Sequence, residues 1–161
     1  MMVMNNFIAA RYEFALGETK TNISLIFRNM KKNIIASLVG VAVSQVVNMC
    51  IVFLALIMGP SQFRNVDMSN KEAFLEAMQS MTAADYMWPL AAHILGVFAG
   101  LTVARMMCRS SHIPMYVVAT IHIILTIINL TQIPHPTWFA ILDVLVPIGL
   151  TFAFLQLKLK K

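Results

Sequence analysis

Four long runs of apolar residues, almost free of charged side chains, constrain this sequence more than any other feature. About 20 helical residues cross the hydrocarbon core of a membrane. The runs lack the alternation of barrel strands, and lipid accepts only helices or closed barrels because backbone polar groups must be paired. The sequence therefore predicts an all-α integral membrane protein, a four-helix bundle with spans at about 34–58, 87–103, 114–133 and 138–157.

The charge content supports a membrane protein. Only 12% of the residues are charged, about half the share of a soluble domain. The formal net charge of +5 does not indicate a nucleic-acid partner, because the basic residues lie at the ends of the apolar runs. The expected partner is the lipid bilayer. Cys50 and Cys108 are expected near opposite membrane faces, so no bridge between them is predicted.

The basic residues also predict the orientation. Of the 12 lysines and arginines, all but Arg64 and Lys71 precede the first run, lie between the second and third, or follow the fourth. Lysine and arginine concentrate in cytoplasmic loops, and Trp and Tyr in the interfaces. We therefore expect N-in/C-in topology in a cell inner membrane, with Tyr86, Trp88 and Trp138 at the outer interface.

Residues 1–29 form an N-terminal interfacial or cytoplasmic extension in front of the transmembrane domain at 30–161. Apolar and charged residues alternate loosely in the extension, and Gly17 interrupts the pattern, which predicts short interfacial helices. The sequence Met30-Lys31-Lys32 is also typical of the start of a small bacterial membrane protein. An over-extended translation start is therefore the alternative interpretation of 1–29.

The first outer loop contains a helix signature. Ser69 and Glu72 have the spacing of an S-x-x-E capping box. After it, one face of the predicted helix carries Phe74, Leu75, Met78 and Met81. We expect an amphipathic helix that lies on the membrane or covers the bundle, or that docks a partner.

Polar residues within the spans fall on one stripe per helix. Asp143 is the sole acid in any span, and His93 lies at a similar depth, so His93 is its expected partner. The predicted intramembrane polar layer consists of His93, Asp143, Asn129 and Asn48 in the outer half, with His122 beneath. Two interpretations stay open: a site for a proton, cation or small polar ligand, and a structural hydrogen-bond network.

The second span carries a stripe of small residues, Ala92, Gly96, Gly100 and Ala104. Small side chains allow close approach of another helix. We expect this helix-packing stripe to lie inside the bundle, with a homodimer seam as the alternative.

The turn between the third and fourth spans is rich in proline. Pro134 and Pro136 flank His135 and predict a stiff reversal, with Thr137 as an N-cap and Trp138 as an interface anchor. A rigid turn explains the pattern, and a pH-sensitive role of His135 is the alternative.

Motifs of known chemistry are not found. The sequence has no G-x-S-x-G, H-E-x-x-H, Cys-x-x-Cys or glycine-rich phosphate loop. We therefore predict no catalytic residues, no metal site and no cofactor, and we do not expect an enzyme.

Two motifs carry a family resemblance. Ala92-His93-x-Leu95-Gly96-x-x-x-Gly100, and the turn from Ile133 to Phe139, resemble a set of small, uncharacterised four-span bacterial inner-membrane proteins. The likeness covers about residues 31–157 and departs at Asn48, near which that family carries an acid. It implies four spans and an inner membrane, and it implies no activity.

Two functional classes follow from these features. The first is a structural or accessory membrane subunit that assembles through helix packing, as a homo-oligomer or with another membrane subunit. The second is a small oligomeric transporter or channel for protons, cations or a small polar solute, which would use the polar layer.

Overall fold

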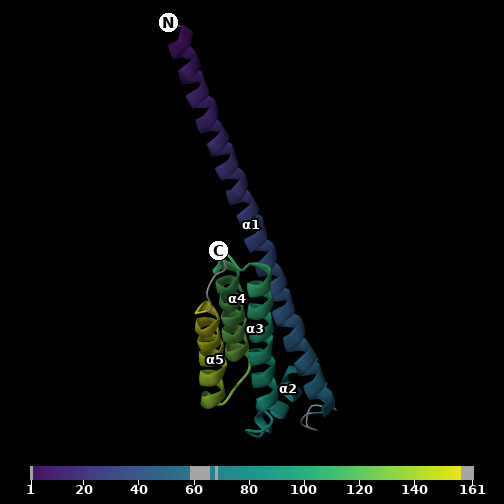
Figure 1. Ribbon diagram of the computed structural model, residues 1–161. Coiled ribbons are helices and arrows are strands. Elements are labelled where there is room, and N and C mark those ends of the chain that lie inside the picture. The colour runs from purple at the N-terminus through teal and green to yellow at the C-terminus, as the bar shows by residue number, and fades with distance from the viewer. Residues whose placement is uncertain (1, 59–65, 68, 157–161) are drawn as a thin grey trace.

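The computed structural model describes residues 2–58, 66–67 and 69–156. All regular structure in these ranges is helical (Figure 1). Four helices are long and apolar enough to cross a membrane, one of them by its part Asn22–Met58. In the described ranges, the predicted all-helical fold with four helices able to span a membrane is confirmed. The helices are α1 (Met2–Met58), α2 (Lys71–Gln79), α3 (Met87–Met107), α4 (Ile113–Gln132) and α5 (Thr137–Leu155).

Helices α4 and α5 begin and end close to the predicted positions, whereas α1 begins well before residue 34 and α3 ends beyond Val103. Helix α3 continues four residues past the expected end at Val103 and includes Arg105 in its last turn. A long basic side chain can extend from a helix end to the headgroups, so a charge that ends an apolar run does not end the helix. Two prolines stand where helices tolerate them, Pro114 in the first turn of α4 and Pro136 as the N-cap of α5, whereas Pro147 lies inside α5.

Helix α1 is continuous and extends well beyond the other helices (Figure 1). Its 57 residues make about 85 Å at 1.5 Å per residue. The expected break at Gly17 is wrong, because the helix passes through this residue. One glycine costs a helix about 1 kcal/mol, which the long flanking segments offset.

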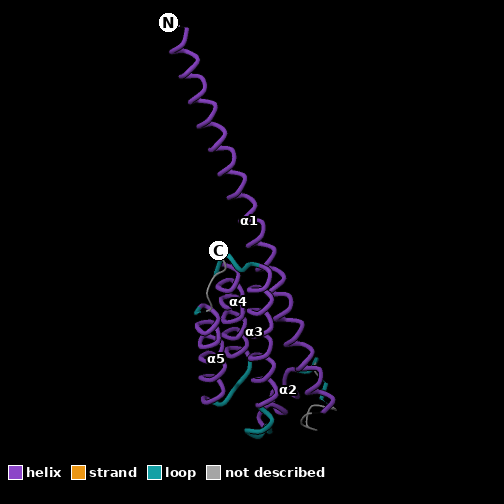
Figure 2. Tube along the Cα trace, in the orientation of Figure 1, coloured by secondary structure: helices purple, strands orange, loops and turns teal. Residues whose placement is uncertain are grey.

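Helices α3 and α4 form the centre of the bundle. Helix α1 packs on both of them, and α5 packs on both from the other side (Figure 2). The outward faces expose large apolar side chains that lipid would cover, among them Leu38 and Phe53 of α1 and Leu145 and Phe152 of α5. The four polar stripes therefore meet through the α3–α4 pair.

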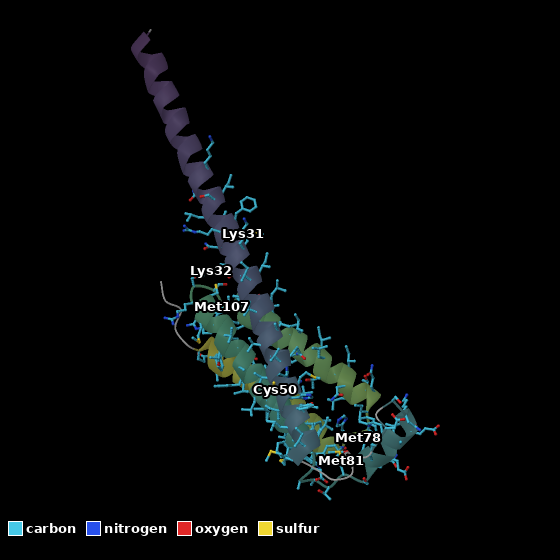
Figure 3. All side chains as sticks on the ribbon, turned by 90° about the vertical axis from the view of Figure 1, so that its right-hand side faces the viewer. Lys31, Lys32, Cys50, Met78, Met81 and Met107 are labelled. Carbon is cyan, nitrogen blue, oxygen red and sulfur yellow. The ribbon has the colours of Figure 1, made fainter. Side chains whose placement is uncertain are left out.

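The two ends of the bundle differ in character. We call one end the α2 end, because α2 lies there; α1 and α4 finish at this end and α3 and α5 begin there. Figure 3 shows Lys31, Lys32 and Met107 at the opposite end from Met78 and Met81. At the α2 end, the buried Met78 packs in one cluster with Tyr86, Leu90 and Phe139. Helix α2 thus closes this end of the bundle.

The start of α2 corrects the predicted capping box. Its N-cap is Asn70, whose Oδ1 accepts from the backbone N–H groups of Glu72 at 3.0 Å and Ala73 at 3.2 Å. The hydroxyl of Ser69 instead donates to Asp67 Oδ1 at 2.6 Å. Asparagine caps a helix as well as serine does, and the neighbouring carboxylate takes the serine hydroxyl. The box anchored on Ser69 is therefore wrong by one residue.

Candidate functional site

The small-residue stripe of α3 packs against α1. A Cβ added at Gly96 would lie 2.8 Å from the carbonyl oxygen of Ser44, and one added at Gly100 would lie 2.7 Å from that of Gly40. The outer members of the stripe, Ala92 and Ala104, are fully buried. Within this chain, the stripe therefore packs against α1, which occupies the space beside Gly96 and Gly100.

His93 and Asp143 form a close pair between α3 and α5. The Nδ1 atom of His93 lies 2.7 Å from Oδ1 and 2.8 Å from Oδ2 of Asp143. Asp143 is 0% exposed, so its carboxyl group has exchanged water for the imidazole. The expected contact between these two residues is present.

His122 extends this pair toward α1. Its ring stands edge-on to that of His93, with the ring centres 5.8 Å apart. Its Nδ1 atom faces the hydroxyl of Ser44 at 3.4 Å, and the residue is 3% exposed. Four helices therefore contribute to one polar cluster, which we call the His–Asp cluster and define as Ser44, His93, His122 and Asp143.

A cavity of about 390 Å³ lies beside the His–Asp cluster, in the half of the bundle nearer α2. Four of the five predicted layer residues line it: Asn48, His93, His122 and Asn129. Asp143 is buried behind His93 and is not among the lining residues. Sequence depth alone placed His122 beneath the other layer residues, and the structure adds that Asn48, His93, His122 and Asn129 share one cavity wall.

Two polar atoms on this wall lack partners. Asn48 Oδ1 and His122 Nε2 are buried, and neither has a hydrogen bond within the described part of the chain. A buried polar group left without a partner costs about 1–3 kcal/mol, and such groups are few in folded proteins. Both residues line the same cavity, so an occupant of that cavity could satisfy both.

The cavity also reaches the lipid-facing surface. Its lining includes Met49 of α1, which is 65% exposed, and Leu125 of α4, which is 43% exposed. At the α2 end, Phe74 and Met78 of α2 and Trp88 of α3 contribute to its wall. The cavity is therefore covered by α2 at one end and opens sideways between α1 and α4.

The proline turn contributes a residue that sequence reasoning did not assign to the cavity. His135 lines it, and its Nδ1–H donates to the carbonyl oxygen of Ile133 at 2.7 Å. The ring stacks on Phe139, with centres 4.8 Å apart and an interplanar angle of 11°. Burial lowers the pKa of His135 below its ordinary value of 6.5. The prolines predict a stiff turn, and this turn places the imidazole of His135 at the cavity wall.

The rest of the turn differs from expectation at one position. Pro136 is the N-cap of α5 and makes no side-chain cap, and Thr137 is the first helical residue. The predicted N-cap at Thr137 is therefore wrong. Pro134 is exposed, and Trp138 stands edge-on to Phe139 and Tyr86 in the aromatic cluster at the α2 end.

Metal-ligating residues do not gather in the described ranges. No group of three or more His, Cys, Asp or Glu side chains is close enough there to hold a metal ion. Cys50 and Cys108 are both free thiols, and Cys108 Sγ–H donates to Asn33 Oδ1 at 3.0 Å.

The fold and this site define a class: a multi-pass membrane protein with a partly polar cavity among its spanning helices. No family model, curated protein or solved structure matches the chain. The resemblance carried by the second span and the proline turn therefore stays an expectation, and the function is argued from the cavity.

Proposed function

We propose that this chain is a small-molecule-binding membrane protein that takes its ligand into the cavity between α1 and α4. One observation carries the proposal: Asn48 Oδ1 and His122 Nε2 are buried without partners on the wall of the same cavity. A ligand that binds both atoms removes their desolvation penalty. Such a site would serve a membrane protein that transports or senses a small solute.

A conduction path for protons or cations has less support than a binding cavity. His93 and Asp143 satisfy each other, and the carboxyl group does not reach the cavity. Toward the opposite end, the hydroxyl of Ser37 donates to the backbone of Asn33, and that of Thr151 to the backbone of Pro147. Hydroxyls bound to their own helix do not continue a polar route from the cavity.

An accessory-subunit role is the second candidate. Its support is the part of α1 that extends beyond the bundle (Figure 1), where Ile23, Ile26, Phe27 and Met30 are exposed and recur at helical spacing. The small-residue stripe of α3 no longer supports this role, because α1 covers it.

We further propose an inner-membrane location with both termini in the cytoplasm and the α2 end outside. The support is the distribution of lysine and arginine, which places ten of twelve on the proposed cytoplasmic side. Reporter fusions at residue 161 and in the loop at 66–67 test the orientation. We expect cytoplasmic signal at the C-terminus and periplasmic signal in the loop, and the reverse pattern would refute the proposed orientation.

Photolabelling tests the binding function. The purified protein is placed in phosphatidylcholine vesicles with three diazirine probes that share one hydrocarbon chain and carry a hydroxyl, a sulfate or a trimethylammonium head. We expect at least one probe to label residues 45–56 and 122–133 saturably. The substitution Val52→Trp should fill the cavity and abolish this labelling, because Val52 lines it.

The matched control is Leu145→Trp, on the exposed face of α5. This substitution should leave saturable labelling unchanged. If all three probes label lipid-facing residues without saturation, the cavity does not bind amphiphilic ligands and the proposed function is wrong.

A further inference from the structure

The cavity wall is hydrogen-bonding but carries no free charge near its unpartnered atoms. Of the residues that the structure describes, no lysine or arginine lines the cavity. The acid that does line it is Asp85, near the α2 end, and its Oδ2 accepts from the backbone N–H and the hydroxyl of Thr82 at 2.7 and 2.8 Å. A charged head placed beside Asn48 would lose its hydration without meeting an opposite charge.

The unpartnered atoms specify which hydrogen bonds an occupant must make. Asn48 Oδ1 is an acceptor and needs a donor. His122 Nε2 donates or accepts according to the tautomer, and the hydroxyl of Ser44 at Nδ1 is compatible with both tautomers. A hydroxyl group both donates and accepts, so it can satisfy Asn48 and pair with either tautomer of His122.

The rest of the lining indicates how such a head would arrive. Apolar side chains make up much of the remaining lining, and Met49 and Leu125 stand both on the cavity and on the lipid-facing surface. A hydrocarbon tail can follow this opening between α1 and α4 into the bilayer, where it loses no apolar contact.

Building on the proposed binding function, we propose that the ligand is a neutral amphiphile dissolved in the membrane, with a hydroxyl-bearing head bound to Asn48 and His122 and a tail that leaves between α1 and α4. The class includes long-chain alcohols, monoacylglycerols and quinols. It excludes inorganic ions and amphiphiles whose head is a permanent charge.

Competition against one probe tests the chemistry of the head. The probe is a diazirine-bearing oleyl alcohol in phosphatidylcholine vesicles, and labelling is measured by peptide mass mapping of residues 45–56 and 122–133. The competitors are oleyl alcohol, its methyl ether, oleyl sulfate and oleyltrimethylammonium, which share the tail. We expect oleyl alcohol to compete at least about fivefold better than the methyl ether, which keeps the acceptor oxygen but carries a methyl group in place of the donor hydrogen.

Charged competitors provide the second comparison. Both should compete more weakly than the alcohol. Equal or better competition by the methyl ether, the sulfate or the ammonium compound would overturn the proposed ligand class. In that case saturable labelling would still support a ligand cavity, whereas loss of all saturable labelling would refute the proposed function itself.

Two substitutions test whether Asn48 and His122 cause the preference for the alcohol over the ether. Asn48→Leu and His122→Leu should each bring the alcohol-to-ether ratio close to one, and Thr131→Val, at an exposed position, should leave the ratio unchanged. Circular dichroism and size-exclusion chromatography show whether each variant folds. The competition series on the unmodified protein decides the proposal even if a variant fails to fold.

Discussion

The imidazole Nδ1 of His93 lies 2.7 Å from Oδ1 of Asp143, and this pair joins α3 to α5 at a fully buried carboxyl group. Removing one member of a buried pair leaves the other without a partner in a medium that cannot hydrate it. Removing both members together leaves no such group. We therefore expect single and double substitutions of this pair to change the free energy of unfolding very differently.

A double-mutant cycle measures this relationship. His93→Leu should lower the free energy of unfolding by about 3–5 kcal/mol, because it isolates the carboxyl group. The double variant His93→Leu/Asp143→Leu should be more stable than the sum of the two single effects predicts, with a coupling of about 1–3 kcal/mol. Unfolding by SDS in mixed micelles provides the free energies.

The control for this cycle is Thr102→Val. The hydroxyl of Thr102 donates to the carbonyl oxygen of Phe98 in the same helix, so its loss should change the free energy of unfolding by less than about 0.5 kcal/mol. Additive effects of the two cluster substitutions would show that His93 and Asp143 do not interact in the folded protein.

The sequence allows this pair to be predicted because the physical constraints are strong. A lone acid in hydrocarbon needs a partner, and the rise of an α-helix fixes the depth of each residue. His93 and Asp143 each lie a few residues inside their spans, so equal depth follows from residue counting. The number of spanning helices follows in the same way from the length of the apolar runs.

Other features depend on which helices are neighbours, and hydropathy does not encode that. In sequence, Gly40 and Ser44 of α1 and Asp143 of α5 look equivalent as small or polar residues within an apolar run. In the structure, Gly40 and Ser44 meet the small-residue stripe of α3, and Asp143 meets His93. The sideways opening at Met49 and Leu125 depends on the same arrangement. Sequence patterns also do not decide which of two neighbouring polar residues caps a helix, and here Asn70 rather than Ser69 caps α2.

Close packing of α1 against α3 predicts that Gly100→Ala destabilises the protein. The new methyl group would lie 2.7 Å from the carbonyl oxygen of Gly40 and 2.8 Å from Ser44 Cβ, so the two helices must move apart. We expect a loss of about 1–3 kcal/mol in the free energy of unfolding, measured by SDS unfolding in mixed micelles.

Gly149→Ala is the matched comparison, because it makes the same substitution in α5 where no atom lies within 4 Å of the new Cβ. This variant should be neutral or more stable by up to about 1 kcal/mol, since alanine favours the helix over glycine. Equal destabilisation by both substitutions would contradict the assigned α1–α3 interface.

The cap of α2 gives a local prediction. Asn70→Ala removes the side chain that accepts from Glu72 and Ala73, and loss of an N-cap costs about 0.5–2 kcal/mol. Hydrogen exchange of residues 72–79 should become faster by the corresponding factor. Ser69→Ala removes only a hydroxyl bound to the exposed Asp67, so exchange in α2 should hardly change. The opposite ranking would restore Ser69 as the cap.

His135 predicts how stability depends on pH at the α2 end. Burial lowers its pKa in the folded protein below the ordinary value of 6.5, while its bond to Ile133 and the charge of Asp143 act in the other direction, and His93 adds to the lowering. Well above pH 6.5, His135 is neutral in both the folded and the unfolded protein, and it does not make stability depend on pH. As the pH falls below 6.5, the unfolded chain takes up a proton that the folded protein resists, so stability falls.

His135→Gln isolates this contribution because glutamine cannot titrate. The free energy of unfolding of both proteins is measured between pH 7.5 and 5 in the same micelles. Other histidines contribute to both curves, so the difference between the curves reports on residue 135. We expect the unmodified protein to lose stability relative to the variant as the pH falls through the range below 6.5. A difference that is constant with pH, or that favours the unmodified protein at low pH, would show that the imidazole is not held neutral against Phe139.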